Sequence, residues 1–264
     1  MLLGCIGNDL YGKKIKEALE KANVIPLLEE RTDIESSRCA VAVHKKERCL
    51  MPEIRASTML SMEFVEKNIE QISKASILFI EGYFVIERFD IIQKLVAHFH
   101  GLKKSVAFTL SATFMVENFR DRMLEIANES HIIFCNNEEA DVFSGDSSGD
   151  YEKISILIHK MLKPIYNGRL LVITCGKDPV VISRYDYENQ QLDFILKSFV
   201  HAIDNDDIVD TNGCGDSFVG GFLSQYIQGK SLEVCARAGN WASSVIIRNV
   251  GCTYPDELEI KKFD

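Results

Sequence analysis

The sequence predicts an α/β protein in which a mostly parallel sheet is covered by helices on both faces. Between residues 60 and 174, short apolar strands alternate with amphipathic helices, the pattern of a parallel sheet buried between two helical layers. The chain has 264 residues and is 46% hydrophobic, so we expect a single domain over residues 1–264. A glycine turn at residues 213–215 carries the strongest functional signal.

The first 57 residues combine a strand, a helix and a region without helical rhythm. Residues 2–6 predict a strand, and residues 11–22 predict a helix. Residues 38–44 and 48–51 then predict two short strands. We therefore expect a small β lid at about residues 24–57.

The central region supplies the alternating elements of the sheet. Helices are predicted over residues 62–74, 88–98, 117–128 and 151–162. They alternate with predicted strands over residues 77–80, 106–110, 132–135 and 170–174, and strands 180–183 and 194–199 are expected to extend one edge. Ligands gather at the carboxyl ends of parallel strands, so the residues that follow these strands are candidates for binding: Tyr83, Ser111, Phe114, Asn136, Glu139, Gly176 and Asp178.

Residues 208–218 predict a strand, a glycine turn and a helix in succession. The strand is Ile208-Val209, and apolar residues repeat at helical spacing from Phe218 onward. Gly213 and Gly215 permit positive φ and close approach of the backbone to a ligand. The first amides of a helix lack intrahelical partners, and the helix dipole adds positive charge there. The turn therefore predicts an anion site suited to a phosphate.

Asp216 lies at the mouth of this anion site. A carboxylate repels a phosphate, but it can accept the proton of a hydroxyl that attacks one. The structural alternative is an aspartate that merely caps a glycine turn. The residues by themselves leave both interpretations open.

The segment Asp210-Thr-Asn-Gly-Cys-Gly-Asp-Ser-Phe218 resembles the carboxy-terminal signature, D-T-x-G-A-G-D, of the ribokinase/PfkB superfamily of small-molecule kinases. It is similar to the adenosine kinases in particular, as are Gly4-Cys-Ile-Gly-Asn-Asp, Asn136-Asn-Glu-Glu-Ala and Gly251-Cys-Thr-Tyr. The resemblance implies a ribokinase-like three-layer αβα sandwich with a mostly parallel sheet and a small β lid. It also implies phosphorylation of the adenosine 5′ hydroxyl to give AMP, with ATP and Mg2+ as cofactors.

The resemblance assigns roles to particular residues. Asp216 corresponds to the catalytic base, and Gly213, Cys214 and Gly215 correspond to the catalytic anion-binding turn, where Cys214 replaces the usual Ala. Arg48 corresponds to a lid arginine that approaches the transferring phosphate; its structural alternative is an exposed hairpin arginine. The remaining implied contacts are those of Leu50, Tyr83, Phe114 and Asn212 with substrate, and those of Asn136, Thr174, Gly176, Asp178, Gly213 and Gly215 with ATP.

Asn136 and Glu139 match the outer positions of an N-x-x-E motif of this superfamily. They are three residues apart at the start of a predicted helix, so both can face one ligand. The resemblance implies that Glu139 holds Mg2+ through water. The structural alternative is ordinary helix capping, with acidic residues in the first turn.

Composition limits the partners and the compartment. A net charge of -9 and a pI near 5.3 argue against binding to nucleic acid or to acidic membranes. The sequence has no apolar run near the roughly 20 residues of a membrane span and no secretory signal at its start, so we expect a cytoplasmic or nuclear protein. The resemblance implies a monomer whose small-molecule partners are adenosine and ATP.

In the family, the strand that corresponds to residues 2–6 follows a segment that supplies another strand, part of the lid and ribose-binding residues. We find no such segment in this sequence. Three hypotheses therefore stay open: an adenosine kinase, a superfamily kinase for a sugar or another nucleoside, and a truncated or inactive member that acts as a binding or regulatory protein. A panel of acceptor substrates distinguishes them.

Overall fold

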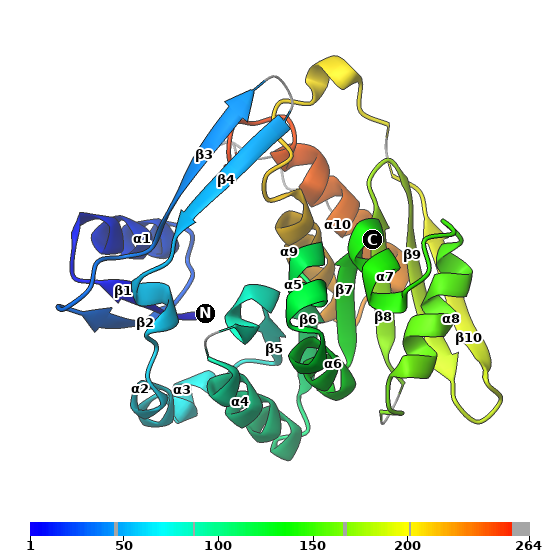
Figure 1. Ribbon diagram of the computed structural model, residues 1–264, viewed down its shortest axis with the longest axis horizontal. Helices are drawn as coiled ribbons and strands as arrows, with labels where there is room; N and C mark the ends of the chain where they lie inside the picture. Colours follow the sequence, from blue (N-terminus) through cyan, green and yellow to red (C-terminus); the bar gives the residue numbers. More distant parts are fainter. Residues whose placement is uncertain (45–46, 87, 166–167, 201, 255–264) are drawn as a thin grey trace. The chain divides into compact units, whose positions relative to one another are not determined.

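The computed structural model describes residues 1–44, 47–86, 88–165, 168–200 and 202–254. The chain forms two compact units. The amino-terminal unit contains residues 1–76 and 86–97, and the sheet unit contains residues 77–85 and 98–264. Figure 1 labels the elements of both units.

The amino-terminal unit contains two small sheets. β1 (Leu2–Gly7) pairs in parallel with β2 (Pro26–Arg31), and β3 (Arg38–His44) pairs in antiparallel fashion with β4 (Glu47–Glu53). The unit's helical elements are α1 (Leu10–Lys21), η1 (Ala56–Thr58), α2 (Met62–Lys67), α3 (Ile69–Ile72) and the first residues of α4 (Phe89–Gly101). The two predicted lid strands are therefore confirmed as strands, whereas β2 is an element that the sequence analysis missed.

Asp9 explains where α1 begins. Its carboxylate accepts a hydrogen bond from the Gly12 amide at 2.7 Å, which satisfies one of the amides at the start of the helix. The same carboxylate accepts hydrogen bonds from the backbone and the hydroxyl of Ser36, at 2.7 and 2.9 Å. These bonds hold the pKa of Asp9 below its ordinary value, because backbone amides stabilise the ionised form.

The sheet unit is built on one six-stranded sheet. Its order is β10-β9-β8-β7-β6-β5, in which β5 to β8 are parallel and β9 and β10 are antiparallel to their neighbours (Figure 1). The strands are β5 (Ile77–Ile80), β6 (Ser105–Thr109), β7 (Ile132–Asn136), β8 (Leu170–Cys175), β9 (Asp178–Asp186) and β10 (Gln191–Ser198). The mostly parallel sheet and its extension by two strands at one edge are confirmed.

Helices cover both faces of this sheet. In β7, Ile132, Ile133, Phe134 and Cys135 are all buried, so side chains pointing to either face are removed from water. The helices of the unit are α5 (Thr113–Asn118), α6 (Arg120–Glu129), α7 (Asn137–Ser144), α8 (Tyr151–Met161), α9 (Cys214–Tyr226) and α10 (Leu232–Ile246), with short turns η2 (Gly82–Val85) and η3 (Asn205–Asp207). One face packs against α9 and α10 through Phe218, Phe222 and Ala236.

Close packing fixes α9 against α10. A Cβ on Gly221 would lie 2.6 Å from the Ala238 carbonyl oxygen, and a Cβ on Gly239 would lie 2.8 Å from the Phe218 ring. Only glycine allows the two helices to approach this closely. The small residues of α10 therefore serve core packing, and they set the position of the functional turn at the start of α9.

Three sequence-based predictions of secondary structure were wrong in detail. Ile208 and Val209 form no strand; the amides of Val209 and Asp210 instead donate to the Ile247 carbonyl at 2.9 and 3.2 Å. The helix predicted over 62–74 breaks at Asn68, and the helix predicted over 117–128 breaks at Phe119.

The two breaks share a local feature. The Asn68 side-chain amide donates to the Phe64 carbonyl at 2.8 Å, and the Asn118 side-chain amide donates to the Phe114 carbonyl at 2.7 Å. In both places an asparagine side chain bonds back to the carbonyl four residues earlier, in the last turn before the break. No helix in the described part of the chain is long and apolar enough to span a membrane.

Candidate active site

The glycine turn lies at the start of α9. Gly213 has φ +74°, a left-handed conformation that a residue with a Cβ adopts only at a cost, and it precedes the helix without a side-chain cap. A Cβ on Gly213 would also lie 2.7 Å from Cys252 Sγ. The Ser217 amide donates to the Gly213 carbonyl at 2.8 Å and so closes the first helical turn.

Asp210 ties this turn to the segment that carries Cys252. Its carboxylate accepts the Asn212 amide at 2.9 Å and the Gly251 amide at 3.0 Å. The Asn212 side chain donates to the same carboxylate at 3.2 Å. Two segments far apart in the sequence are thus held together at the amino end of α9.

The open side of the turn carries Gly215 and Asp216. Both are exposed, and no heavy atom lies within 4 Å of the position that a Gly215 Cβ would take. Asp216 stands in the first turn of α9, a helix of 13 residues. The dipole of this helix end therefore lies beside a carboxylate and next to the open space at Gly215, an arrangement that can bind an anion and accept a proton.

Asn136 and Glu139 form a capping box at the start of α7. The Asn136 side chain accepts the Glu139 amide at 2.7 Å, and the Glu139 carboxyl accepts the Asn136 amide at 3.0 Å. The Asn136 side-chain amide also donates to Glu139 at 2.9 Å. The structure therefore confirms that Asn136 and Glu139 cap α7. A role of Glu139 in holding magnesium would be additional to this capping role.

Three carboxyl groups from separate elements interact in this unit. Burial raises the pKa of Glu139 to about 7, the Asn136 amide opposes this, and the charges of Glu138, Glu81 and Asp216 raise it further. Burial also raises the pKa of Glu81, against hydrogen bonds from Ser111, Tyr83 and Gly82, and Asp216 adds to the rise. The charges of Glu81, Glu139 and Asp216 thus act on one another, but no three such side chains of the described residues lie close enough together to hold a metal ion directly.

Glu81 was not among the predicted site residues. It directly follows β5, at the carboxyl edge where ligands of parallel sheets gather. Its position after a strand could therefore have marked Glu81 as a candidate for ligand binding. The sequence did not indicate that the charge of Asp216, 135 positions later in the chain, would raise the pKa of Glu81.

Tyr83 and Phe114 form an exposed aromatic pair at the same edge of the sheet. Their ring centroids are 5.8 Å apart, and the two residues are 45% and 46% exposed. Two apolar rings held in water beside polar groups are suited to packing against a flat base. The structure therefore brings together two of the predicted substrate contacts.

The other predicted residues take several positions. Thr174 on β8 is the register partner of Asn136, so the ends of β7 and β8 meet; Gly176, with φ +61°, and Asp178 follow at the β8–β9 turn. Leu50 and the backbone of Arg48 belong to β4 in the amino-terminal unit, and the Arg48 side chain lies outside the described part. The roles of these residues remain predictions.

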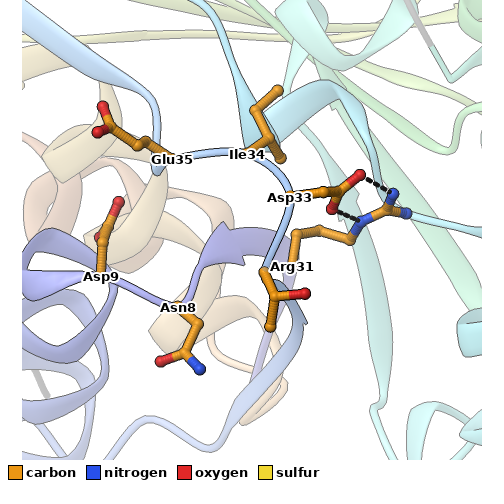
Figure 2. Close-up of a pocket in the computed structure, with 7 residues that line it drawn as sticks. Asn8, Asp9, Arg31, Asp33, Ile34 and Glu35 are labelled. Atoms are coloured by element: carbon orange, nitrogen blue, oxygen red, sulfur yellow. Dashed lines mark hydrogen bonds and ion pairs between the residues drawn. The ribbon is translucent and has the colours of Figure 1, made fainter.

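Among the residues that the structure describes, the amino-terminal unit contains a polar cavity and a groove. A polar cavity of about 160 Å³ is lined by Asn8, Asp9 and residues 31–35, and Figure 2 shows Arg31 paired there with Asp33. A groove of about 670 Å³ runs between α1 and the β3–β4 hairpin. In the polar cavity, Asp9 and Arg31 are already used by bonds within the unit.

Comparison with known proteins defines the class. Residues 1–259 match the family described as pfkB family carbohydrate kinase. The chain is 35% identical over 264 residues to adenosine kinase 1 of Arabidopsis thaliana, covering 97% of this chain and 74% of that protein. It is 26% identical over 257 residues to the adenosine kinase of Saccharomyces cerevisiae, covering 96% and 73%.

Solved structures agree with the sequence matches. Adenosine kinase of Anopheles gambiae, in complex with P1,P4-di(adenosine-5) tetraphosphate, has a TM-score of 0.86 at 26% identity, with 97% of this chain and 76% of that chain covered. Adenosine kinase of Schistosoma mansoni, in complex with 2-fluoroadenosine, has a TM-score of 0.84 at 27% identity, with 96% and 75% covered.

The chain belongs to the pfkB family of carbohydrate kinases, a family of phosphotransferase enzymes. Within this family, the relatives and solved structures named above are adenosine kinases. The predicted ribokinase-like α/β fold is confirmed by the same comparisons.

Proposed function

We propose that this chain transfers the γ-phosphoryl group of ATP to the 5′ hydroxyl of adenosine, giving AMP for purine salvage. The observation that carries the proposal is Asp216, which stands in the first turn of α9 beside the open glycine turn and interacts with Glu139 and Glu81. The adenosine kinases among its relatives support adenosine as the acceptor. The relative solved with P1,P4-di(adenosine-5) tetraphosphate supports ATP as the donor.

The chemistry follows from the glycine turn. The amides of Gly213, Cys214 and Gly215 face the phosphoryl oxygens, and Asp216 accepts the proton as the hydroxyl attacks in line. Most of the rate enhancement then comes from orientation and from fixed donors. One such donor is typically worth about 3 kcal/mol, so distortion of this turn lowers the rate by orders of magnitude.

The aromatic pair and the strand ends complete the proposed site. Tyr83 and Phe114 hold the adenine, and Asn212 contributes to the acceptor side. Asn136, Thr174, Gly176 and Asp178 line the ATP side at the carboxyl ends of β7 and β8. Arg48 and Leu50 contribute from the lid, and the enzyme acts as a monomer of one kinase domain.

Magnesium fits the donor set of this site through water. Both Glu139 oxygens already accept hydrogen bonds from Asn136, which leaves lone pairs for a coordinated water but disfavours displacement of the cap. A cation held through water beside Glu139 would also offset the charges of Glu138 and Asp216, which raise the pKa of Glu139. Bound there, Mg2+ neutralises charge on the transferring phosphoryl group.

The test is AMP formation from adenosine and ATP by the purified chain. Asp216→Asn should remain folded and lose nearly all turnover, because the amide cannot accept the proton. Asp206→Asn makes the same chemical change at an exposed aspartate of η3 that is not among the proposed site residues, and it should retain activity.

Other acceptor substrates distinguish an adenosine kinase from a kinase for a sugar or another nucleoside and from a non-catalytic regulatory protein. Ribose, other sugars and other nucleosides are offered in parallel, and a higher kcat/KM for one of them would replace adenosine in the proposal. Full turnover by Asp216→Asn would overturn the assignment of the base. ATP binding without turnover of any acceptor would favour a regulatory role.

A further inference from the structure

The ends of β5 and β6 are clamped together in a way that none of the predicted roles explains. The Gly82 amide donates to Ser111 Oγ at 2.8 Å, across 29 positions of sequence. A Cβ on Gly82 would lie 2.7 Å from the same oxygen and 2.8 Å from the Thr109 carbonyl oxygen. The two strand ends therefore meet with no space between them.

Ser111 is held in a strained conformation at this junction. Its φ is +67°, a region that costs a serine about 1–3 kcal/mol and is concentrated at functional sites in proteins. This conformation places the Ser111 hydroxyl where the Gly82 amide can reach it. The strain is thus tied to a specific contact between the two strand ends.

Glu81 completes the clamp. Its carboxyl accepts the Tyr83 amide at 3.0 Å, and it also interacts with the Ser111 hydroxyl. Glu81 is half-buried; its charge raises the pKa of Glu139, and the charge of Asp216 raises the pKa of Glu81. Burial of a carboxylate is costly unless hydrogen bonds compensate for the lost water, and here the Tyr83 amide and the Ser111 hydroxyl supply them.

The group that these bonds position is the Tyr83 backbone. Tyr83 follows Gly82 directly, and its ring forms the exposed pair with Phe114, which itself follows Ser111 by three positions. The clamp therefore holds the two stretches of backbone that carry the rings, one at each strand end. Preorganised walls of this kind lower the entropic cost of binding a flat ligand.

We propose that Glu81 is a positioning residue of the acceptor site, which acts by anchoring the Gly82–Tyr83 turn to Ser111 so that Tyr83 and Phe114 stand ready for the nucleoside base. This inference rests on the proposed function and deepens it, since it concerns the wall that holds the acceptor. It separates Glu81 from the residues that contact phosphate.

The test measures KM for adenosine and KM for ATP separately in three variants. Glu81→Ala removes the acceptor of the Tyr83 amide and should raise KM for adenosine about tenfold, with KM for ATP within about twofold of the wild-type value. Glu81→Gln keeps an oxygen that can accept this amide and should stay within about threefold for both. Ser111→Ala removes the partner of Gly82 and should act like Glu81→Ala.

Glu188→Ala is the matched control, because it removes one exposed carboxylate from the turn between β9 and β10. It should leave both KM values unchanged. Thermal melting of every variant shows whether a raised KM comes from displacement of the Gly82–Tyr83 turn in a folded protein or from loss of folding. If Glu81→Ala does not fold, Glu81→Gln and Ser111→Ala decide the question.

Three results would overturn the inference while leaving the proposed function intact. The first is an unchanged KM for adenosine in Glu81→Ala and Ser111→Ala, and the second is a rise in KM for ATP in these variants equal to the rise in KM for adenosine. The third is a Glu81→Gln variant as impaired as Glu81→Ala, because that result would indicate that Glu81 acts through its charge and not by positioning Tyr83. If the wild-type chain neither phosphorylates nor binds adenosine in a calorimetric titration, the proposed function is refuted and this inference with it.

Discussion

Substitution of Gly213 tests whether the glycine turn is as constrained as its geometry indicates. Gly213→Ala forces alanine into φ +74°, which costs about 1 kcal/mol or more for a residue with a Cβ. The new methyl group would also lie 2.7 Å from Cys252 Sγ and 3.3 Å from Cys252 Cβ, so the neighbouring segment has to move. Displacement of packed atoms costs typically about 1 kcal/mol or more.

Together these terms lower the free energy of unfolding by about 2 kcal/mol. For a chain of this size, a loss of that magnitude lowers Tm by about 4–8 °C. The rate of AMP formation should fall by a larger free-energy equivalent than the free energy of unfolding, because the same turn supplies the amides of residues 213–215 that are proposed to bind phosphate. Thermal melting and AMP formation are measured on the same preparation.

Two further variants separate conformational strain from steric contact. Gly213→Ala combined with Cys252→Ala removes the sulfur that the methyl group meets, so about half of the lost stability should return while the strain of positive φ remains. Gly220→Ala is the control: no heavy atom lies within 4 Å of its Cβ position in α9, so helix propensity should raise stability by about 0.5–1 kcal/mol. Wild-type melting of Gly213→Ala, or no recovery in the double variant, would refute the reasoning.

Two other predictions concern the same region. Gly215→Ala should fold like the wild-type chain, because no atom lies near its Cβ position. It should bind ATP at least about tenfold more weakly, since the methyl group enters the space assigned to phosphate. Calorimetric titration measures the affinity, and an unchanged value would place the phosphate elsewhere. Glu139→Gln should change how stability depends on pH. The pKa of Glu139 is raised by burial from 4.5 to about 7, so its contribution is complete below pH 4.5 and is lost as the pH rises through about 7. Glutamine has one oxygen that can still accept the Asn136 backbone amide and carries no charge, so the variant should gain up to about 3 kcal/mol relative to wild type between pH 5 and pH 8. Urea denaturation at the two pH values measures this gain, and parallel losses in both proteins would contradict the assignment.

Much of the sheet unit was determined by local sequence. Short apolar runs such as Ile132 to Cys135 alternate with amphipathic helices, and a strand buried on both faces needs just such a run. The turn at Gly213 and the helix start at Asn136 were likewise predictable, because positive φ and amino-terminal capping select particular residue types.

Other features depended on contacts that local sequence does not encode. The strand β2 was missed because its pattern, Pro-Leu-Leu-Glu-Glu-Arg, does not alternate, and its pairing with β1 stabilises it. The interruptions at Asn68 and Phe119 each coincide with a side-chain bond from an asparagine, which a periodic pattern does not register.

The sequence by itself therefore determined the class of fold, the glycine turn and the residues that follow the strands, because each depends on neighbours within a few positions. Only the tertiary structure decided that Asp210 binds Gly251, that Cys252 packs on Gly213 and that Glu81, Ser111 and Tyr83 form a clamp. These contacts join residues up to 41 positions apart, and they exist only once the sheet and its helices have packed. The carboxyl group of Glu81 thus acquires its place beside Asp216 from the fold, since nothing in its immediate sequence specifies that partner.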